Sequence, residues 1–180
     1  MNQKIKFPRS EKVYLPGTLF PELRVAMRKV EQVPSTNFID GEKVLTPNPE
    51  VYVYDTSGPF SDPAVEVDLK KGLPRLREPW ILKRGDVEQL SEITSEYGRM
   101  RRDDQSLDSL RFEHITLPYR ALQGKCCTQM YYAKQGIITP EMEYVAIREN
   151  MNCAELGIET HITPELSLIH ISEPTRPEPI

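Results

Sequence analysis

The chain has 180 residues, enough for one ordinary domain, and its net charge of -4 comes from 27 acidic and 23 basic residues spread along the whole length. Because the sequence offers no basic face, nucleic acid is not expected as a partner. No stretch approaches the ~18 consecutive apolar residues of a membrane helix, and the first ten residues lack the apolar centre of a signal peptide. We therefore expect a cytoplasmic protein that does not contact membranes.

The first third of the chain is typical of β structure interrupted by proline. A short apolar run at residues 12–15, an alternation of apolar and polar residues over 23–33 and the run VYVY at 51–54 predict three strands. The segment 55–63 is rich in Gly, Pro, Ser and Asp, which predicts an ordered loop. Residues 65–69 predict a brief fourth strand.

The middle of the chain predicts one helix followed by a loop. Asp86 is a good N-cap with Gln89 three residues later, and Gly98 stands where helices often end, so residues 87–97 are predicted to be helical. Residues 99–109 are strongly charged and have no sustained period, which predicts an exposed loop.

A stronger helix signal follows at Thr139-Pro140-Glu141. A capping threonine, a proline at the first helical position and acidic side chains near the positive end of the helix dipole predict a helix from Pro140 to about Met151. The same pattern recurs at Thr163-Pro164-Glu165, where another helix is expected to begin. Taken together, the elements predict an α+β fold with a small, mostly antiparallel sheet and flanking helices.

The cysteines and histidines do not form a convincing site. The three cysteines are odd in number and two are adjacent, so reduced thiols are expected. A nucleophile relay of Cys126 or Cys127 with His114 or His161 has no supporting spacing, and Cys153 with His161 fits no structural zinc pattern.

Other short motifs favour structural roles. Arg84-Gly85-Asp86 precedes the predicted helix and supplies its cap, and Gly124-Lys125 lacks the spacing of a phosphate loop. Tyr131-Tyr132 lies on a predicted short helix, where core packing is favoured over stacking on a ligand. The loop at residues 55–63 keeps a functional or interface role open, because a fixed turn can present backbone donors or brace a neighbouring domain.

The end of the chain differs in character from the rest. Residues 166–176 (LSLIHISEPTR) do not continue a helix, and Pro177 and Pro179 exclude helical extension. This run resembles one reading frame of a transposon-derived sequencing adapter, codon for codon over eleven residues. Residues 166–180 are therefore expected to be foreign, with a natural polar tail as the alternative, and His170 has no functional weight in either case.

Several runs, in the same order, resemble the N-terminal region of phosphomethylpyrimidine synthases, the ThiC family. The resemblance spans about residues 7–165. Its most specific blocks are VYDTSGPF-x-DP at residues 53–63 and GIITPEMEY-x-AIREN at 136–150, accompanied by FP-x-S-x-x-VY, LRV-x-MR, GLP, PWI, RGD, LRF and TQMYYA.

The resemblance implies an enzyme of thiamin biosynthesis. Family members are radical-SAM carbon–carbon lyases that convert 5-aminoimidazole ribonucleotide to 4-amino-5-hydroxymethyl-2-methylpyrimidine phosphate. They use S-adenosylmethionine cleaved at a [4Fe–4S] cluster, and they also bind zinc. The implied architecture is an N-terminal domain, a (β/α)8 barrel and a C-terminal three-cysteine segment, in a cytoplasmic homodimer.

Carried over residue by residue, the resemblance assigns no catalytic, cofactor-binding or metal residue to this chain. Cys126, Cys127 and Cys153 do not reproduce the C-x-x-C-x-x-x-x-C spacing of the cluster ligands. We expect residues 1–117 to form the N-terminal ThiC-associated domain and 118–165 a helical lead-in to a barrel that the chain lacks. The chain alone is then expected to bind none of the cofactors and to be inactive.

Two alternatives remain at this point. One is a non-catalytic structural or interaction module that uses the loop at residues 55–63. The other is a stand-alone enzyme that uses local residues such as Cys127 and His114.

Overall fold

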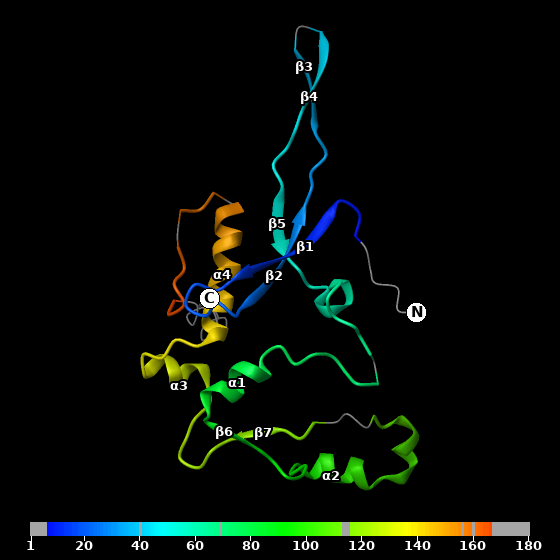
Figure 1. The fold of residues 1–180 in the computed structure, drawn as a ribbon, viewed down its shortest axis with the longest axis vertical. Coiled ribbons are helices and arrows are strands. Elements are labelled where there is room, and N and C mark those ends of the chain that lie inside the picture. The colour runs from blue at the N-terminus through cyan, green and yellow to red at the C-terminus, as the bar shows by residue number, and fades with distance from the viewer. Residues whose placement is uncertain are drawn as a thin grey trace, which may run out of the picture.

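The computed structural model describes residues 7–39, 41–68, 70–112, 116–155, 157–159 and 161–166. These residues form an α+β structure with three small antiparallel sheets and several short helices, as the sequence predicts (Figure 1). No (β/α)8 barrel is present among them. The expected foreign tail lies outside the described residues, apart from Leu166. None of the helices in the described ranges combines the length and the apolar character that a membrane span requires.

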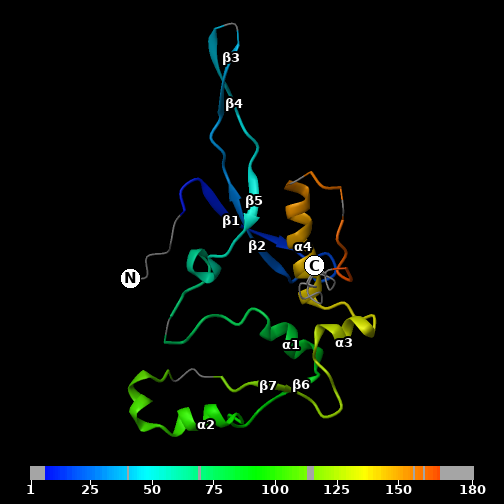
Figure 2. The same cartoon turned by 180° about the vertical axis from the view of Figure 1, so that it is seen from behind.

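The central sheet has the strand order β1-β2-β5, and its neighbours are antiparallel. The three strands predicted from the sequence are confirmed as β1 (Ser10–Pro16), β2 (Arg24–Val30) and β5 (Val51–Tyr54). Val25 and Met27 of β2, and Leu23 just before it, are at most 1% exposed and alternate along the chain, so the two strand residues point to one side of the sheet. The longest helix, α4 (Pro140–Glu155), lies beside this sheet (Figures 1 and 2).

A second ribbon extends away from the central sheet. Strands β3 (Ser35–Ile39) and β4 (Glu42–Thr46) pair with each other, and all ten of their residues are exposed. This hairpin was not predicted from the sequence. Asp40-Gly41 between two runs of strand-forming residues is the signal that could have found it, since Gly41 has a φ of +86° that glycine adopts at little cost.

The prediction of a helix at residues 87–97 is wrong. Val87–Gln89 forms strand β6, which pairs with β7 (Tyr119–Ala121), and Asp86 accepts a hydrogen bond from the Tyr132 hydroxyl instead of capping a helix. A partner some thirty residues away in the chain therefore overrides the local helix signal.

The prediction of an exposed loop at residues 99–109 is also wrong. Helix α2 (Glu96–Asp103) begins after Ser95, whose Oγ accepts from the Gly98 amide at 3.1 Å, so Gly98 lies in the first turn and not at the end of a helix. The 3-10 helix η2 (Gln105–Leu110) follows, capped by Asp104. Neither helix buries a residue. In the sequence, these two helices are marked by their N-capping residues Ser95 and Asp104, because neither helix has an apolar period.

The predicted strand at residues 65–69 is also not present in its described part. Residues 65–67 belong to no strand, Asp68 makes one isolated bridge with Gly72, and Leu69 lies outside the described residues. Helix α1 (Glu78–Arg84) follows and was not predicted; it places Trp80 with its ring centroid 6.0 Å from that of Tyr144.

The helix predicted from Pro140 is confirmed and continues to Glu155. Thr139 caps it, accepting from the Met142 amide at 3.3 Å. Helix α3 (Gln129–Lys134) packs against it through Tyr132 and Met142, which are 4% and 0% exposed, so packing is the role of Tyr132. The Thr163-Pro164-Glu165 pattern gives only a turn at residues 164–166 in the described part.

Glu143 connects the start of α4 to the turn between β1 and β2. Glu143 is 3% exposed, and its carboxylate accepts hydrogen bonds from the backbone amides of Thr18 and Leu19, both at 2.6 Å, and of Phe20 at 2.8 Å. A Cβ atom at Gly17 would lie 2.3 Å from the Phe20 carbonyl oxygen and 2.6 Å from the Glu143 carboxylate. Only glycine therefore allows this close approach.

Contacts cross the expected boundary between residues 117 and 118. Strand β7 lies after it and pairs with β6 before it, and Glu143 binds amides at residues 18–20. The division into 1–117 and 118–165 stays a prediction. In the structure, residues on the two sides of this boundary contact each other.

Replacing Glu143 tests this connection. Glu143→Gln keeps the size of the side chain but removes its charge and turns one accepting oxygen into a donor. We expect the free energy of unfolding to fall by about 3 kcal/mol, because buried amides lose their acceptor. Urea denaturation followed by circular dichroism measures it, with the exposed Glu66→Gln as the control. Equal midpoints for the two variants would show that the connection contributes nothing to stability.

Candidate functional site

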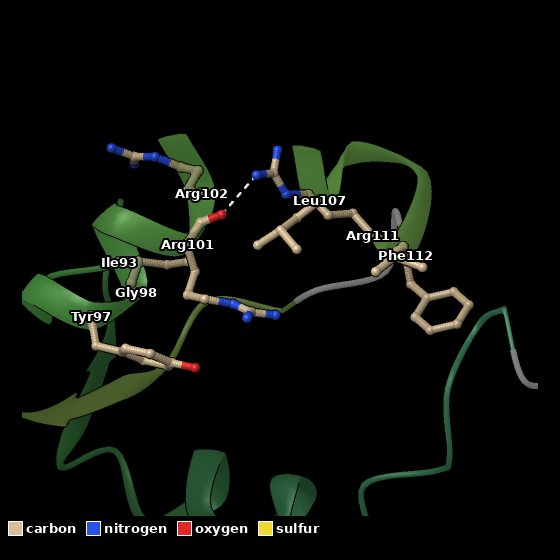
Figure 3. Close-up of a pocket in the computed structure, with 9 residues that line it drawn as sticks. Ile93, Tyr97, Gly98, Arg101, Arg102, Leu107, Arg111 and Phe112 are labelled. Atoms are coloured by element: carbon tan, nitrogen blue, oxygen red, sulfur yellow. Dashed lines mark hydrogen bonds between the residues drawn. The ribbon is translucent and has the colours of Figure 1, made fainter. Parts of the chain in front are cut away.

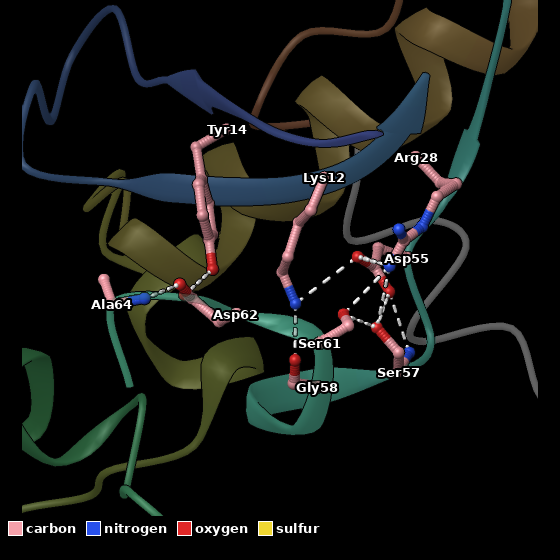
Figure 4. Close-up of polar contacts among 9 residues, drawn as sticks. All are labelled: Lys12, Tyr14, Arg28, Asp55, Ser57, Gly58, Ser61, Asp62 and Ala64. Carbon is pink, nitrogen blue, oxygen red and sulfur yellow. Dashed lines mark hydrogen bonds and ion pairs between the residues drawn. The ribbon is translucent and has the colours of Figure 1, made fainter. Parts of the chain in front are cut away.

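The loop at residues 55–63 is the segment for which the sequence left a functional role open. It follows β5 and contains the 3-10 helix η1 (Gly58–Ser61). Side chains of β1 and β2 reach down to it: Lys12, Tyr14 and Arg28 all point toward the loop (Figure 4).

Asp55 is the centre of one half of this site. Its side chain is 1% exposed and lies 2.9 Å from the Arg28 guanidinium and 3.3 Å from the Lys12 ammonium. It also accepts hydrogen bonds from the Ser57 amide, at 2.8 Å, and from the Ser57 hydroxyl. Burial alone would raise the pKa of Asp55, but the Ser57 hydrogen bonds and the two cations lower the pKa below its ordinary value.

The two cations also bind the rest of the loop. Arg28 donates to the Ser57 hydroxyl at 3.1 Å and to the Ser61 hydroxyl at 2.9 Å, while Lys12 donates to the Gly58 carbonyl. One carboxylate and two cations therefore fix both ends of η1.

Asp62 is the centre of the other half. It is 4% exposed and accepts hydrogen bonds from the Tyr14 hydroxyl and from the Ala64 amide, the latter at 2.8 Å. Burial and the hydrogen bond to Asp62 raise the pKa of Tyr14 to about 12. Burial alone would raise the pKa of Asp62, but the hydrogen bonds from Tyr14 and Ala64 lower it. The Arg24 guanidinium lies over the Tyr14 ring, 4.0 Å from its centroid.

We call the five residues Lys12, Tyr14, Arg28, Asp55 and Asp62 the loop clamp. All of these residues except Arg28 line one side of an open cavity of about 270 Å³ that Tyr144 of α4 also borders. Each of its acids is matched by a cation or a hydroxyl donor, so none is left as a free base. The arrangement fixes the conformation of the loop and provides no nucleophile–base pair.

A second polar cluster surrounds the first turn of α4. Glu141 binds Arg84 at 2.9 Å and Arg77 at 3.2 Å. Burial alone would raise the pKa of Glu141, but hydrogen bonding and these two cations lower it. Burial and the hydrogen bond to Asp86 raise the pKa of Tyr132 to about 12. Arg84 and Asp86 therefore both make structural contacts, but Asp86 binds Tyr132 and does not cap the helix predicted after it, and Gly85 ends α1 with a φ of +66°.

The cysteines lie apart from the loop clamp. Cys126 precedes α3, and the hydrogen bonds from the Thr128 hydroxyl and amide lower the pKa of its thiol. Cys127 is exposed, and Cys153 lies on α4. His114 falls outside the described residues, and with it the proposed Cys127–His114 pair.

These donors do not fit an iron–sulfur cluster or a zinc site. A cluster needs three thiolates that converge from separated positions, whereas two of the three cysteines are neighbours in the chain. Within the described ranges, no three His, Cys, Asp or Glu side chains gather where they could hold a metal ion. The prediction that the chain contains no site residues stays a prediction, because His114 and the tail are not described.

The sheet, its flanking helices and the clamped loop define a small α+β domain that is held together by polar contacts. Residues 6–88 match the family model of the ThiC-associated domain. The matched range runs from before β1 into β6 and contains the whole loop clamp. Over residues 6–88 this match confirms the resemblance to the N-terminal region of the ThiC family, and it points to thiamin biosynthesis.

The loop clamp can be tested by neutralising its central acid. Asp55→Asn preserves shape but removes the anion that the buried cations Lys12 and Arg28 share. We expect a loss of about 3 kcal/mol in the free energy of unfolding and faster hydrogen exchange at the Ser57 amide. The exposed Asp103→Asn is the matched control. Wild-type stability in Asp55→Asn would mean that the clamp is not energetically coupled to the fold.

The same carboxylates predict a pH dependence. Asp55 and Asp62 have folded-state pKa values below their ordinary 3.8, so the stability they contribute is present above that pH and is lost as the pH falls through the folded-state values. Urea midpoints measured from pH 6 down to about pH 2.5 should decline for the wild type and decline less for Asp55→Asn. Parallel pH profiles for the two proteins would contradict this assignment.

Proposed function

We propose that the chain is the N-terminal, non-catalytic part of a phosphomethylpyrimidine synthase. The intact enzyme would convert 5-aminoimidazole ribonucleotide to 4-amino-5-hydroxymethyl-2-methylpyrimidine phosphate in the cytoplasm, as a radical-SAM lyase. The observation that carries the proposal is the ThiC-associated domain at residues 6–88. The run GIITPEMEY-x-AIREN at 136–150, beyond the matched range, supports it because that run resembles the same family.

The geometry supports a structural role for this part, which is to keep its surface in a fixed conformation. The loop clamp fixes the 55–63 loop, and Glu143 attaches the sheet to α4. In the intact enzyme, a [4Fe–4S] cluster with S-adenosylmethionine supplies the radical chemistry. The cysteines of this chain do not fit that cluster, so we assign them no step.

An independently acting interaction module is the second candidate. The exposed apolar residues of the β3–β4 ribbon favour it, because such side chains commonly mark contact surfaces. The two candidates differ at the level of the gene. The first requires the genomic reading frame to continue into a barrel, and the second requires a native stop codon near Glu165.

The proposal predicts that the chain has no activity by itself. Reconstituted anaerobically with iron, sulfide and a reductant, and supplied with S-adenosylmethionine and aminoimidazole ribonucleotide, it should form no pyrimidine phosphate above the protein-free background. An intact phosphomethylpyrimidine synthase treated identically is the positive control, and product is measured by mass spectrometry. Turnover by the 180-residue chain would overturn the assignment of a non-catalytic role.

A further inference from the structure

Cys126 and Cys127 are adjacent thiols in the loop that joins β7 to α3. Both are free, Cys126 is partly exposed and Cys127 is exposed. The groove between α2 and η2 differs, because its charged groups are engaged within the chain. There Arg111 donates to the Arg101 carbonyl at 2.7 Å, and the Arg101 guanidinium lies 5.9 Å from the Tyr97 ring centroid (Figure 3). The two thiols, in contrast, are accessible to a small ion in solution.

Thr128 prepares one of the two thiols for binding. Its hydroxyl lies 3.3 Å from the Cys126 Sγ, and hydrogen bonds from the Thr128 hydroxyl and amide lower the pKa of this thiol. The same hydroxyl accepts from the Tyr131 amide at 3.2 Å, so the Cys126 side chain is connected to the start of α3. Because metals bind the thiolate and not the thiol, Cys126 can bind an ion at a lower pH than an ordinary thiol can.

Adjacency disfavours a disulfide between the two cysteines, but it allows them to share a metal ion. Consecutive Cα atoms are about 3.8 Å apart, whereas the Cα atoms of disulfide-bonded cysteines are usually about 4.4 Å or more apart. The sulfur atoms of a disulfide must also approach to about 2.0 Å. An ion between them relaxes this requirement, because two metal–thiolate bonds of about 2.3 Å each allow the sulfur atoms to lie as far as about 4.6 Å apart.

The number of donors determines the kind of ion. Structural zinc sites have four protein ligands, and within the described parts of the chain no third His, Cys, Asp or Glu side chain gathers with the two thiols. Cu(I) is satisfied by two thiolates in a near-linear arrangement, and soft sulfur ligands favour it over harder ions. Such a two-coordinate site needs no four-ligand spacing in the sequence, which is why zinc and iron–sulfur patterns do not reveal it.

We propose that Cys126 and Cys127 form a Cu(I)-binding site in which both Sγ atoms coordinate one ion. Each Sγ binds as the thiolate, so the thiol protons pass to solvent and the occupied site carries one negative charge. No electron is transferred, because copper enters and remains as Cu(I). The inference concerns a metal that the reaction proposed above does not use, so it holds or fails independently of that reaction.

Anaerobic competition with bicinchoninate, a chelator that forms a coloured complex with Cu(I), tests the proposal on the 180-residue chain. The wild type should withdraw one Cu(I) ion per chain from the chelator. Cys126→Ser and Cys127→Ser should each weaken the affinity by about tenfold or more, because one thiolate remains where two are needed. Cys153→Ser is the matched control. It removes the third free thiol, which lies on α4, and should bind copper as the wild type does.

A measurement on the wild-type chain separates a lost ligand from a folding defect. With one equivalent of Cu(I), alkylation by iodoacetamide, followed by mass spectrometry, should slow at Cys126 and Cys127 and stay unchanged at Cys153.

Several results would overturn the proposal. They are a chain that withdraws no copper from the chelator, full affinity in both single variants, an equal loss in Cys153→Ser, or protection of Cys153 from alkylation. A stoichiometry of one ion for two chains would contradict it as well, since the ligands would then come from two copies.

Discussion

One buried carboxylate connects the central sheet to helix α4. Glu143, in the first turn of α4, accepts three backbone hydrogen bonds from the turn between β1 and β2, about 124 residues earlier in the chain. Amides that converge in this way form a natural anion site, and their burial makes the loss of the acceptor costly. Gly17 is part of the same constraint, because any side chain there would collide with the Phe20 carbonyl and with the carboxylate.

The loop clamp depends on that attachment. Lys12 and Tyr14 project from β1 and Arg28 from β2, so the register of these two strands places the groups that hold the loop. The turn that joins β1 and β2 is the one that Glu143 binds. Helix α4 also reaches the far end of the sheet, where Glu149 accepts from the Tyr54 hydroxyl at 2.8 Å and Arg148 lies 3.7 Å from the Tyr54 ring centroid. Sheet, loop and helix are thus joined by polar contacts around a small apolar core.

Local signals predicted the elements that are locally determined. The strands around Val13, Val25 and Val53, the helix that begins at Pro140 and the ordered 55–63 loop each carry their own pattern of apolar spacing, caps or turn residues. The predictions that failed are those where residues far apart in the chain pair with each other. Asp86 resembles a helix cap, but Tyr132 binds its carboxylate and the following residues pair with β7, and neither partner can be inferred from spacing along the chain. The Glu143 site was missed for the same reason, since one glutamate in a helix does not indicate three distant amides. The resemblance to the ThiC family, by contrast, depended on whole runs of residues, and the domain match confirms it over residues 6–88.

Native-state hydrogen exchange measures the central constraint most directly. If Glu143 joins the β1–β2 turn to α4, the amides of Thr18, Leu19 and Phe20 should open with the same free energy as the amides in the middle of α4, because both become exposed only when the connection is broken. Exchange of these three amides at the rate of an unprotected turn, with α4 still protected, would show that sheet and helix unfold separately and would contradict the account.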